Sequence, residues 1–166
     1  MTKKDNIFAV ATPAGKSAIA LFRITGPNAH SFVKKISSNK KIQKNKTTIN
    51  YILNKEKKPI DQTLTTCFFK PKSYTGENMV EISCHGGRSI IKEISLQLID
   101  LGMRVAERGE FTRRALENNK IDLVQAEAIG DLVDANTDKQ RELAFSGLQG
   151  KLKNFSNETS KKIKEL

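Results

Sequence analysis

The chain has 166 residues, which is enough for one domain or for one domain and part of a second. Its hydrophobic content of 37% and its periodic apolar segments argue against an intrinsically disordered chain. The net charge of +11 is compatible with nucleic acid or another anionic partner. No apolar run approaches membrane-spanning length and no secretory apolar core follows the N-terminus, so we expect a cytosolic protein with no membrane contact.

The first part of the chain has the pattern of strands interrupted by one helix. We expect a short strand at Ile7–Ala11 and a second strand at Ala18–Thr25. In the second strand, residues alternate between two faces, with Phe22 on one face and Arg23 on the other. Gly26 and Pro27 then end the strand and open a helix that runs to about Ile36.

A lysine-rich segment follows, and the strand pattern then returns. Nine lysines and a single acid lie between Lys34 and Lys58, a run that fits a solvated loop better than a nucleic-acid site, since it offers no arginine for phosphate contacts. Strands are expected at Thr47–Leu53 and Gln62–Phe69, joined by a hairpin connection, and at Val80–His85. A helix follows with its buried stripe from Ile90 to Leu101, and Met103–Ala106 is the last short strand. Cys67 and Cys84 both fall in apolar runs, which predicts two buried free thiols rather than a disulfide or a metal site.

Beyond these strands the pattern is wholly helical. Asp122 followed by Gln125 is a helix start of the capping-box kind, and Thr137 followed by Gln140 is a second one. The second helix is expected to continue to Leu166, and the absence of a closing glycine or proline there indicates truncation. The change of pattern predicts a mixed α/β domain over residues 1–119 and the start of a helical domain over residues 120–166.

Three polar motifs carry the functional signal. The first is A-T-P-A-G-K-S at residues 11–17, followed by F-R-I-T-G at residues 22–26, which contains Arg23. Its G-K-S part imitates the end of a phosphate-binding loop. It lacks the required glycine, since Val10 stands five positions before Gly15, and a strand follows it instead of a helix, so we reject nucleotide binding there.

The other two motifs surround residues whose types suit a ligand. S-Y-T-G-E-N-M-V-E-I at residues 73–82 places Glu81 on the polar face of its strand, and H-G-G follows at residues 85–87. G-E-F-T-R-R-A at residues 109–115 leads to N-N-K-I-D-L at residues 118–123, with Lys120 in a turn between helices. Taken singly, Arg23, Glu81 and Lys120 also fit solvent-exposed surface positions, and the structural interpretation of His85 is preferred.

In this order, the three motifs closely resemble the N-terminal part of the MnmE (TrmE) family of bacterial and organellar tRNA-modification GTPases. The family pattern has A-T-P-x-G, R-[IV]-S-G, S-[FY]-T-G-E, H-G-G and G-E-F-[ST]-x-R-A segments, and this chain carries all of them with small changes. Thr25 stands in place of the serine, and Arg108 stands where proline is common. The resemblance extends over essentially the whole chain.

The resemblance implies an α+β fold, namely an N-terminal domain similar to the tetrahydrofolate-binding part of glycine-cleavage aminomethyltransferases, followed by the first helices of an all-α domain. It implies a homodimer that binds a 5-formyl-tetrahydrofolate-type cofactor. By position, the folate-contacting residues are Arg23, Glu81 and Lys120. A carboxylate such as Glu81 accepts two parallel hydrogen bonds from an edge with adjacent N–H donors, and a pterin ring has such an edge.

The resemblance also implies an activity that belongs to the full-length family. There, GTP hydrolysis with Mg and K ions and the flavoprotein partner MnmG serve to add an aminomethyl-type group to the wobble uridine of tRNA. This chain has no complete P-loop, so we expect no GTPase activity and no catalytic residues from it alone. Two alternatives stay open: a self-sufficient folate-dependent aminomethyltransferase, for which the chain is short, and a basic RNA-binding module that uses the Lys34–Lys58 run.

Overall fold

The computed structural model describes residues 5–41 and 43–150, which form two compact units that divide between Phe111 and Thr112. The elements, in chain order, are β1 (Ile7–Val10), β2 (Ile19–Thr25), α1 (Ala29–Ile36), β3 (Thr47–Leu53), β4 (Pro59–Phe68), β5 (Met79–His85), α2 (Arg88–Asp100), β6 (Arg104–Val105), α3 (Glu110–Glu117), α4 (Leu123–Asp134) and α5 (Asp138–Leu148).

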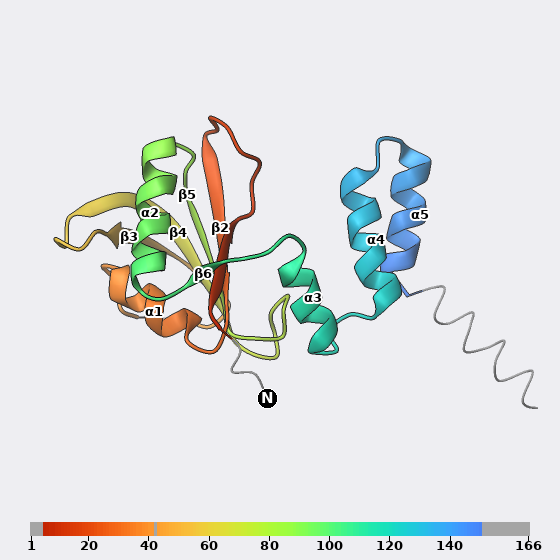
Figure 1. Ribbon diagram of the computed structural model, residues 1–166, viewed down its shortest axis with the longest axis horizontal. Helices are drawn as coiled ribbons and strands as arrows, with labels where there is room; N and C mark the ends of the chain where they lie inside the picture. Colours follow the sequence, from red (N-terminus) through yellow and green to blue (C-terminus); the bar gives the residue numbers. More distant parts are fainter. Residues whose placement is uncertain (1–4, 42, 151–166) are drawn as a thin grey trace, which may run out of the picture. The chain divides into compact units, whose positions relative to one another are not determined.

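The first unit is built on one six-stranded sheet with the order β3-β4-β5-β2-β1-β6. All neighbouring strands are antiparallel except β1 and β6, which are parallel. Helices α1 and α2 pack on one face of this sheet (Figure 1). The mixed α and β content confirms the fold class expected from the sequence, and the domain boundary expected at residue 119 stays a prediction.

The core lies between that face and the two helices. The alternation of apolar residues along each strand places one set of side chains inward. The core residues on the strands include Phe8, Ala20, Phe22, Ile24, Cys67, Val80, Ile82 and Cys84, and those on the helices include Val33, Ile36, Ile94 and Leu98. The opposite set on β2 and β5, which contains Arg23 and Glu81, faces away from this core.

At Gly86, just after β5, another segment of the chain approaches too closely for any side chain. The N–H of Gly86 donates to the carbonyl of Ala18 at 3.2 Å, which brings the two chain segments close together. A Cβ atom at position 86 would collide with the backbone of Ser17. The first glycine of the H-G-G motif therefore allows the loop before β2 to lie against the end of β5.

The two helix starts predicted from the sequence are confirmed in the second unit. Asp122 and Thr137 each cap a helix in a capping box, with Gln125 and Gln140 as their partners. The expected continuous helix to Leu166 is wrong, because α5 ends at Leu148. There, the N–H of Gln149 bonds to the carbonyl of Phe145, and Gly150 takes a φ of 71°, a left-handed conformation that closes a helix. The rest of that expected helix lies outside the described residues.

Both cysteines are buried free thiols, as the sequence predicted. Burial raises the pKa of Cys67 from 9.0 to about 11, against a smaller opposite effect of Lys34. Burial, with a smaller contribution from Asp61, raises the pKa of Cys84 to about 11 as well. Neither thiol should therefore react readily at neutral pH.

These shifts predict a loss of stability in alkali. A group whose pKa is higher in the folded state stabilises the fold fully below its unfolded pKa, and loses that contribution as the pH rises through its folded pKa. We expect the urea midpoint to fall between pH 9 and about 11. The urea midpoint of the double variant Cys67→Ala, Cys84→Ala should fall less over the same range, because it lacks the two thiols. The remaining fall comes from its other titrating groups, which are unchanged. Parallel pH profiles of the two proteins would contradict the assignment.

Candidate ligand site

Arg23 and Glu81 lie directly opposite each other on the central strands β2 and β5. Both side chains point to the face of the sheet away from the core. The Nε and NH2 atoms of Arg23 lie 2.9 and 2.8 Å from the same carboxylate oxygen, Oε1 of Glu81. The two side chains are 28% and 23% exposed, so the ion pair is accessible from solvent. The sequence singled out both residues but did not indicate that they pair with each other.

Two aromatic rings lie at the same ion pair. The guanidinium carbon of Arg23 is 5.1 Å from the centre of the Tyr74 ring and 6.0 Å from the centre of the Phe111 ring. Arginine over an aromatic face is a favourable cation–π arrangement. Sequence reasoning missed both rings as site residues, although Tyr74 belongs to the S-Y-T-G-E segment and Phe111 to the G-E-F segment.

The Tyr74 loop is fixed to the end of β2. Thr75 is fully buried, and its hydroxyl lies 2.7 Å from the hydroxyl of Thr25, the last residue of β2. The Thr25 hydroxyl also donates to Oε2 of Glu77 at 3.1 Å. Gly76, which lies between Thr75 and Glu77 in the sequence, has a φ of 75°, a left-handed conformation that favours glycine. The polar residues of this motif thus hold the loop that carries Tyr74.

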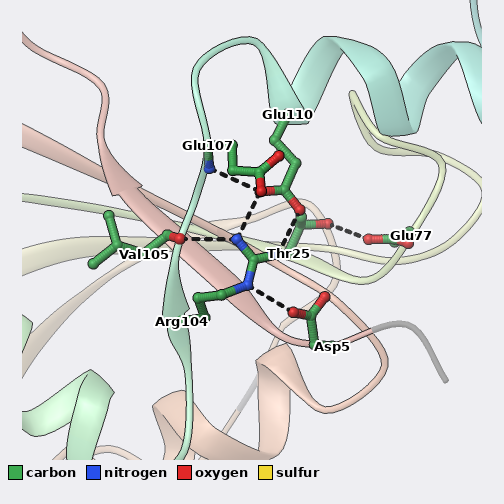
Figure 2. Close-up of polar contacts among 7 residues, drawn as sticks. All are labelled: Asp5, Thr25, Glu77, Arg104, Val105, Glu107 and Glu110. Atoms are coloured by element: carbon green, nitrogen blue, oxygen red, sulfur yellow. Dashed lines mark hydrogen bonds and ion pairs between the residues drawn. The ribbon is translucent and has the colours of Figure 1, made fainter. Parts of the chain in front are cut away.

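Phe111 is held by a second polar cluster at the start of α3. Arg104 donates to both carboxylate oxygens of Glu110, at 2.8 and 3.0 Å, and its Nε donates to Asp5 at 2.9 Å (Figure 2). Glu110 is 2% exposed and also accepts the backbone N–H of Glu107 at 2.8 Å. The hydrogen bonds to Glu110 and then to Asp5 raise the pKa of Arg104 above its ordinary value. This fork fixes the first turn of α3, where Phe111 follows Glu110.

Lys120 is exposed in the turn between α3 and α4, as the sequence predicted. Its N–H donates to the carbonyl of Ala115 at 2.8 Å, and Asn119 before it has a φ of 55°. Lys120 belongs to the second unit, whereas Arg23 and Glu81 belong to the first. The structure therefore brings two of the three predicted residues together, and the role of Lys120 stays a prediction.

His85 has a structural partner. Its backbone N–H donates to Asp61 Oδ2 at 2.8 Å, and its ring Nδ1 lies 2.8 Å from Asp61 Oδ1. The side chain of Asp61 is mostly buried, so this contact ties the first part of β4 to the end of β5. His85 lies four residues after Glu81 on the same strand, about 13 Å along it, which places it away from the ion pair.

Residues from three of the sequence motifs, namely Arg23, Tyr74, Glu81 and Phe111, thus lie together in the first unit. Comparison with known proteins shows which family carries these motifs. The sequence model described as "GTP-binding protein TrmE N-terminus" matches residues 6–120. The chain belongs to this family.

Relatives named "tRNA modification GTPase MnmE" match almost the whole chain. The protein of Fervidobacterium nodosum is 42% identical over 91% of this chain and 34% of its own length. That of Streptococcus thermophilus is 42% identical over 96% of this chain and 35% of its own length. That of Acetivibrio thermocellus is 41% identical over 100% of this chain and 37% of its own length. The chain thus spans about a third of the length of these TrmE relatives.

The TrmE-family sheet also carries an open apolar surface beside the ion pair. Ile19, Ile49 and Leu64 are 60%, 65% and 50% exposed. They line a hollow of about 240 Å³ together with residues of β4 and β5, on the sheet face that carries Arg23 and Glu81. Three large apolar side chains in one hollow are typical of a surface that another molecule covers. Over the described residues, no helix is both long and apolar enough to cross a membrane.

Proposed function

We propose that this chain is the folate-binding part of a tRNA modification GTPase, and that it binds a 5-formyl-tetrahydrofolate-type ligand through Glu81, Arg23 and Lys120. The observation that carries the proposal is the accessible Arg23–Glu81 pair, with two aromatic rings close to the guanidinium of Arg23. Both contacts of Arg23 use Oε1 of Glu81, and Oε2 makes no hydrogen bond to the described residues. A carboxylate with an open oxygen accepts a hydrogen bond from the N–H edge of a pterin ring.

The replacement Glu81→Gln tests the proposal. Glutamine has nearly the same shape but loses the charge, and a hydrogen bond to a charged group contributes about 1.5–3 kcal/mol. We therefore expect 5-formyl-tetrahydrofolate to bind roughly ten- to a hundredfold more weakly in a calorimetric titration. The matched control is Glu56→Gln, which changes an exposed carboxylate in the turn between β3 and β4.

Two results would count against this assignment. Equal affinities of the wild type and Glu81→Gln would remove Glu81 from the site. A folded wild type that binds no folate would refute the folate assignment for this chain.

We also propose that the chain forms a homodimer through the open sheet face that carries Ile49 and Leu64. These two residues are cross-strand partners on β3 and β4, and β3 is an edge strand of the sheet. A second copy that covers Ile49 and Leu64 removes exposed apolar area from water. Oligomers of one chain are usually symmetric, so the same two residues would contribute from both copies.

Leu64→Glu should break this dimer, because it places a charge in the apolar contact. Light scattering over a concentration series should give a dimer for the wild type and a monomer for Leu64→Glu. Leu96→Glu is the control, since Leu96 is similarly exposed but lies on α2, which packs on the opposite face. A wild type that is monomeric at all concentrations, with its fold intact, would sink the proposal.

The GTPase and tRNA-modification activities are proposed for the full-length family protein and not for this chain alone. The sequence contains no G-x-x-x-x-G-K-[ST] pattern, so GTP hydrolysis with its Mg and K ions would depend on a separate G domain. The modification of the wobble uridine would require tRNA and the flavoprotein MnmG as partners. In this scheme, the chain provides the one-carbon donor site and the contact between the two copies.

A further inference from the structure

Tyr74 and Phe111 are not explained by core packing. Neither ring belongs to the hydrophobic core cluster, which lies on the other face of the sheet. Both side chains are only partly buried, and they come from chain segments that are separated by β5, α2 and β6. What they share is their position at the guanidinium of Arg23. Two rings from distant segments that meet at an accessible ion pair indicate a surface built for a flat group.

The contacts of the Arg23 guanidinium indicate which chemical group can bind beside Glu81, Tyr74 and Phe111. This guanidinium is flat and delocalised, it presents N–H donors to the Glu81 carboxylate, and its central carbon lies 5.1 and 6.0 Å from the centres of two aromatic rings. A fused heterocycle with an amino group beside a ring N–H has the same combination of a flat face and a donor edge. Such rings stack on aromatic side chains in an offset or edge-to-face manner.

We infer that Tyr74 and Phe111 determine specificity for the ligand ring, by contacting the flat heterocycle while its donor edge faces Glu81. This inference rests on the folate site proposed above and adds the residues that recognise the ring. Arg23 then serves a remaining polar or anionic group of the ligand.

The two rings are held before any ligand arrives. The Tyr74 loop is anchored by the buried hydroxyl pair of Thr25 and Thr75. Phe111 follows Glu110, which Arg104 holds by a fork of two hydrogen bonds. Side chains that are already ordered lose little conformational freedom on binding, so their contacts contribute more fully to affinity.

The test is a calorimetric titration of 5-formyl-tetrahydrofolate into the full chain and four variants. Tyr74→Leu and Phe111→Leu remove a ring but keep an apolar side chain, and each should weaken binding by about tenfold. Tyr74→Phe keeps the ring and should bind within about twofold of the wild type, since stacking needs no hydroxyl. Tyr51→Leu is the matched control, because Tyr51 is the only other tyrosine and is exposed on β3.

A second measurement needs no variant of the rings. Since Tyr51 and Tyr74 are the only tyrosines, ring-labelled tyrosine gives two assignable sets of NMR signals. Titration with 6-methyltetrahydropterin, which is the ring system without the tail, should shift the Tyr74 signals by ring-current effects and leave those of Tyr51 nearly unchanged.

The outcomes separate the two proposals. In one outcome the wild type binds the folate, Glu81→Gln binds it more weakly, and both leucine variants bind it like the wild type. The proposed contact of Tyr74 and Phe111 with the ligand ring is then overturned, and the folate site stands. The ring contact is likewise overturned if the pterin binds without shifting the Tyr74 signals. If the folded wild type binds neither probe, the folate site and the ring contact both fall.

Discussion

Replacing Phe22 with alanine is expected to lower the free energy of unfolding of the first unit by about 3–5 kcal/mol, the usual cost of emptying a large aromatic site in a core. Phe22 is fully buried on β2, and its ring centre lies 6.4 Å from that of Phe8. Urea unfolding followed by tyrosine fluorescence reports this unit alone, because the chain has no tryptophan and both tyrosines lie before residue 112.

Leu96→Ala is the control for this experiment. Leu96 is 43% exposed on α2, so its truncation should cost less than about 1 kcal/mol. If the two variants lost similar stability, Phe22 would not be the centre of the core that its burial indicates.

Replacing Arg104 with methionine is expected to cost about 2–3 kcal/mol. The change removes two charge-assisted hydrogen bonds to the buried carboxylate of Glu110 and one to Asp5, and hydrogen bonds to charged groups contribute about 1.5–3 kcal/mol. Because Arg104 is partly exposed, the cost comes mainly from the carboxylate that stays buried. Arg104→Lys should lose part of this amount, since an ammonium group keeps the charge but not the planar fork.

Arg108→Met is the matched control, because Arg108 is exposed in the same segment and makes no hydrogen bond or ion pair with the described residues. It should unfold at nearly the wild-type urea concentration. A loss in Arg108→Met equal to that in Arg104→Met would mean that net charge, and not the fork, stabilises the segment.

The sequence was informative where local periodicity decides the answer. The alternation along β5 placed Glu81 on the outer face, and that along β2 did the same for Arg23. The capping boxes at Asp122 and Thr137 depend on residues three positions apart, so their pattern was sufficient to predict them. β4 begins at Pro59, earlier than expected, because proline is tolerated as the first residue of a strand.

Features that depend on distant segments could not be predicted. The contact between Arg23 and Glu81 requires the register of two strands that no local pattern fixes. Phe111 follows an irregular segment after β6, and the Arg104–Glu110 fork that holds the start of α3 joins residues six positions apart outside any regular pattern. The length of α5 was overestimated for a local reason, since Gly150 was overlooked as a residue that ends a helix.

The central position of the β2–β5 pair has a consequence for folding. Arg23 and Glu81 are 58 positions apart in sequence, whereas β3 and β4 are joined by the short turn at residues 54–58. Closing the longer loop costs more chain entropy, so we expect the β3–β4 hairpin to form before the β2–β5 ladder. A ligand that needs both residues would find no partner in chains that have made only the hairpin. Its binding would draw the population of molecules toward the complete sheet and slow hydrogen exchange at the amides of β2 and β5.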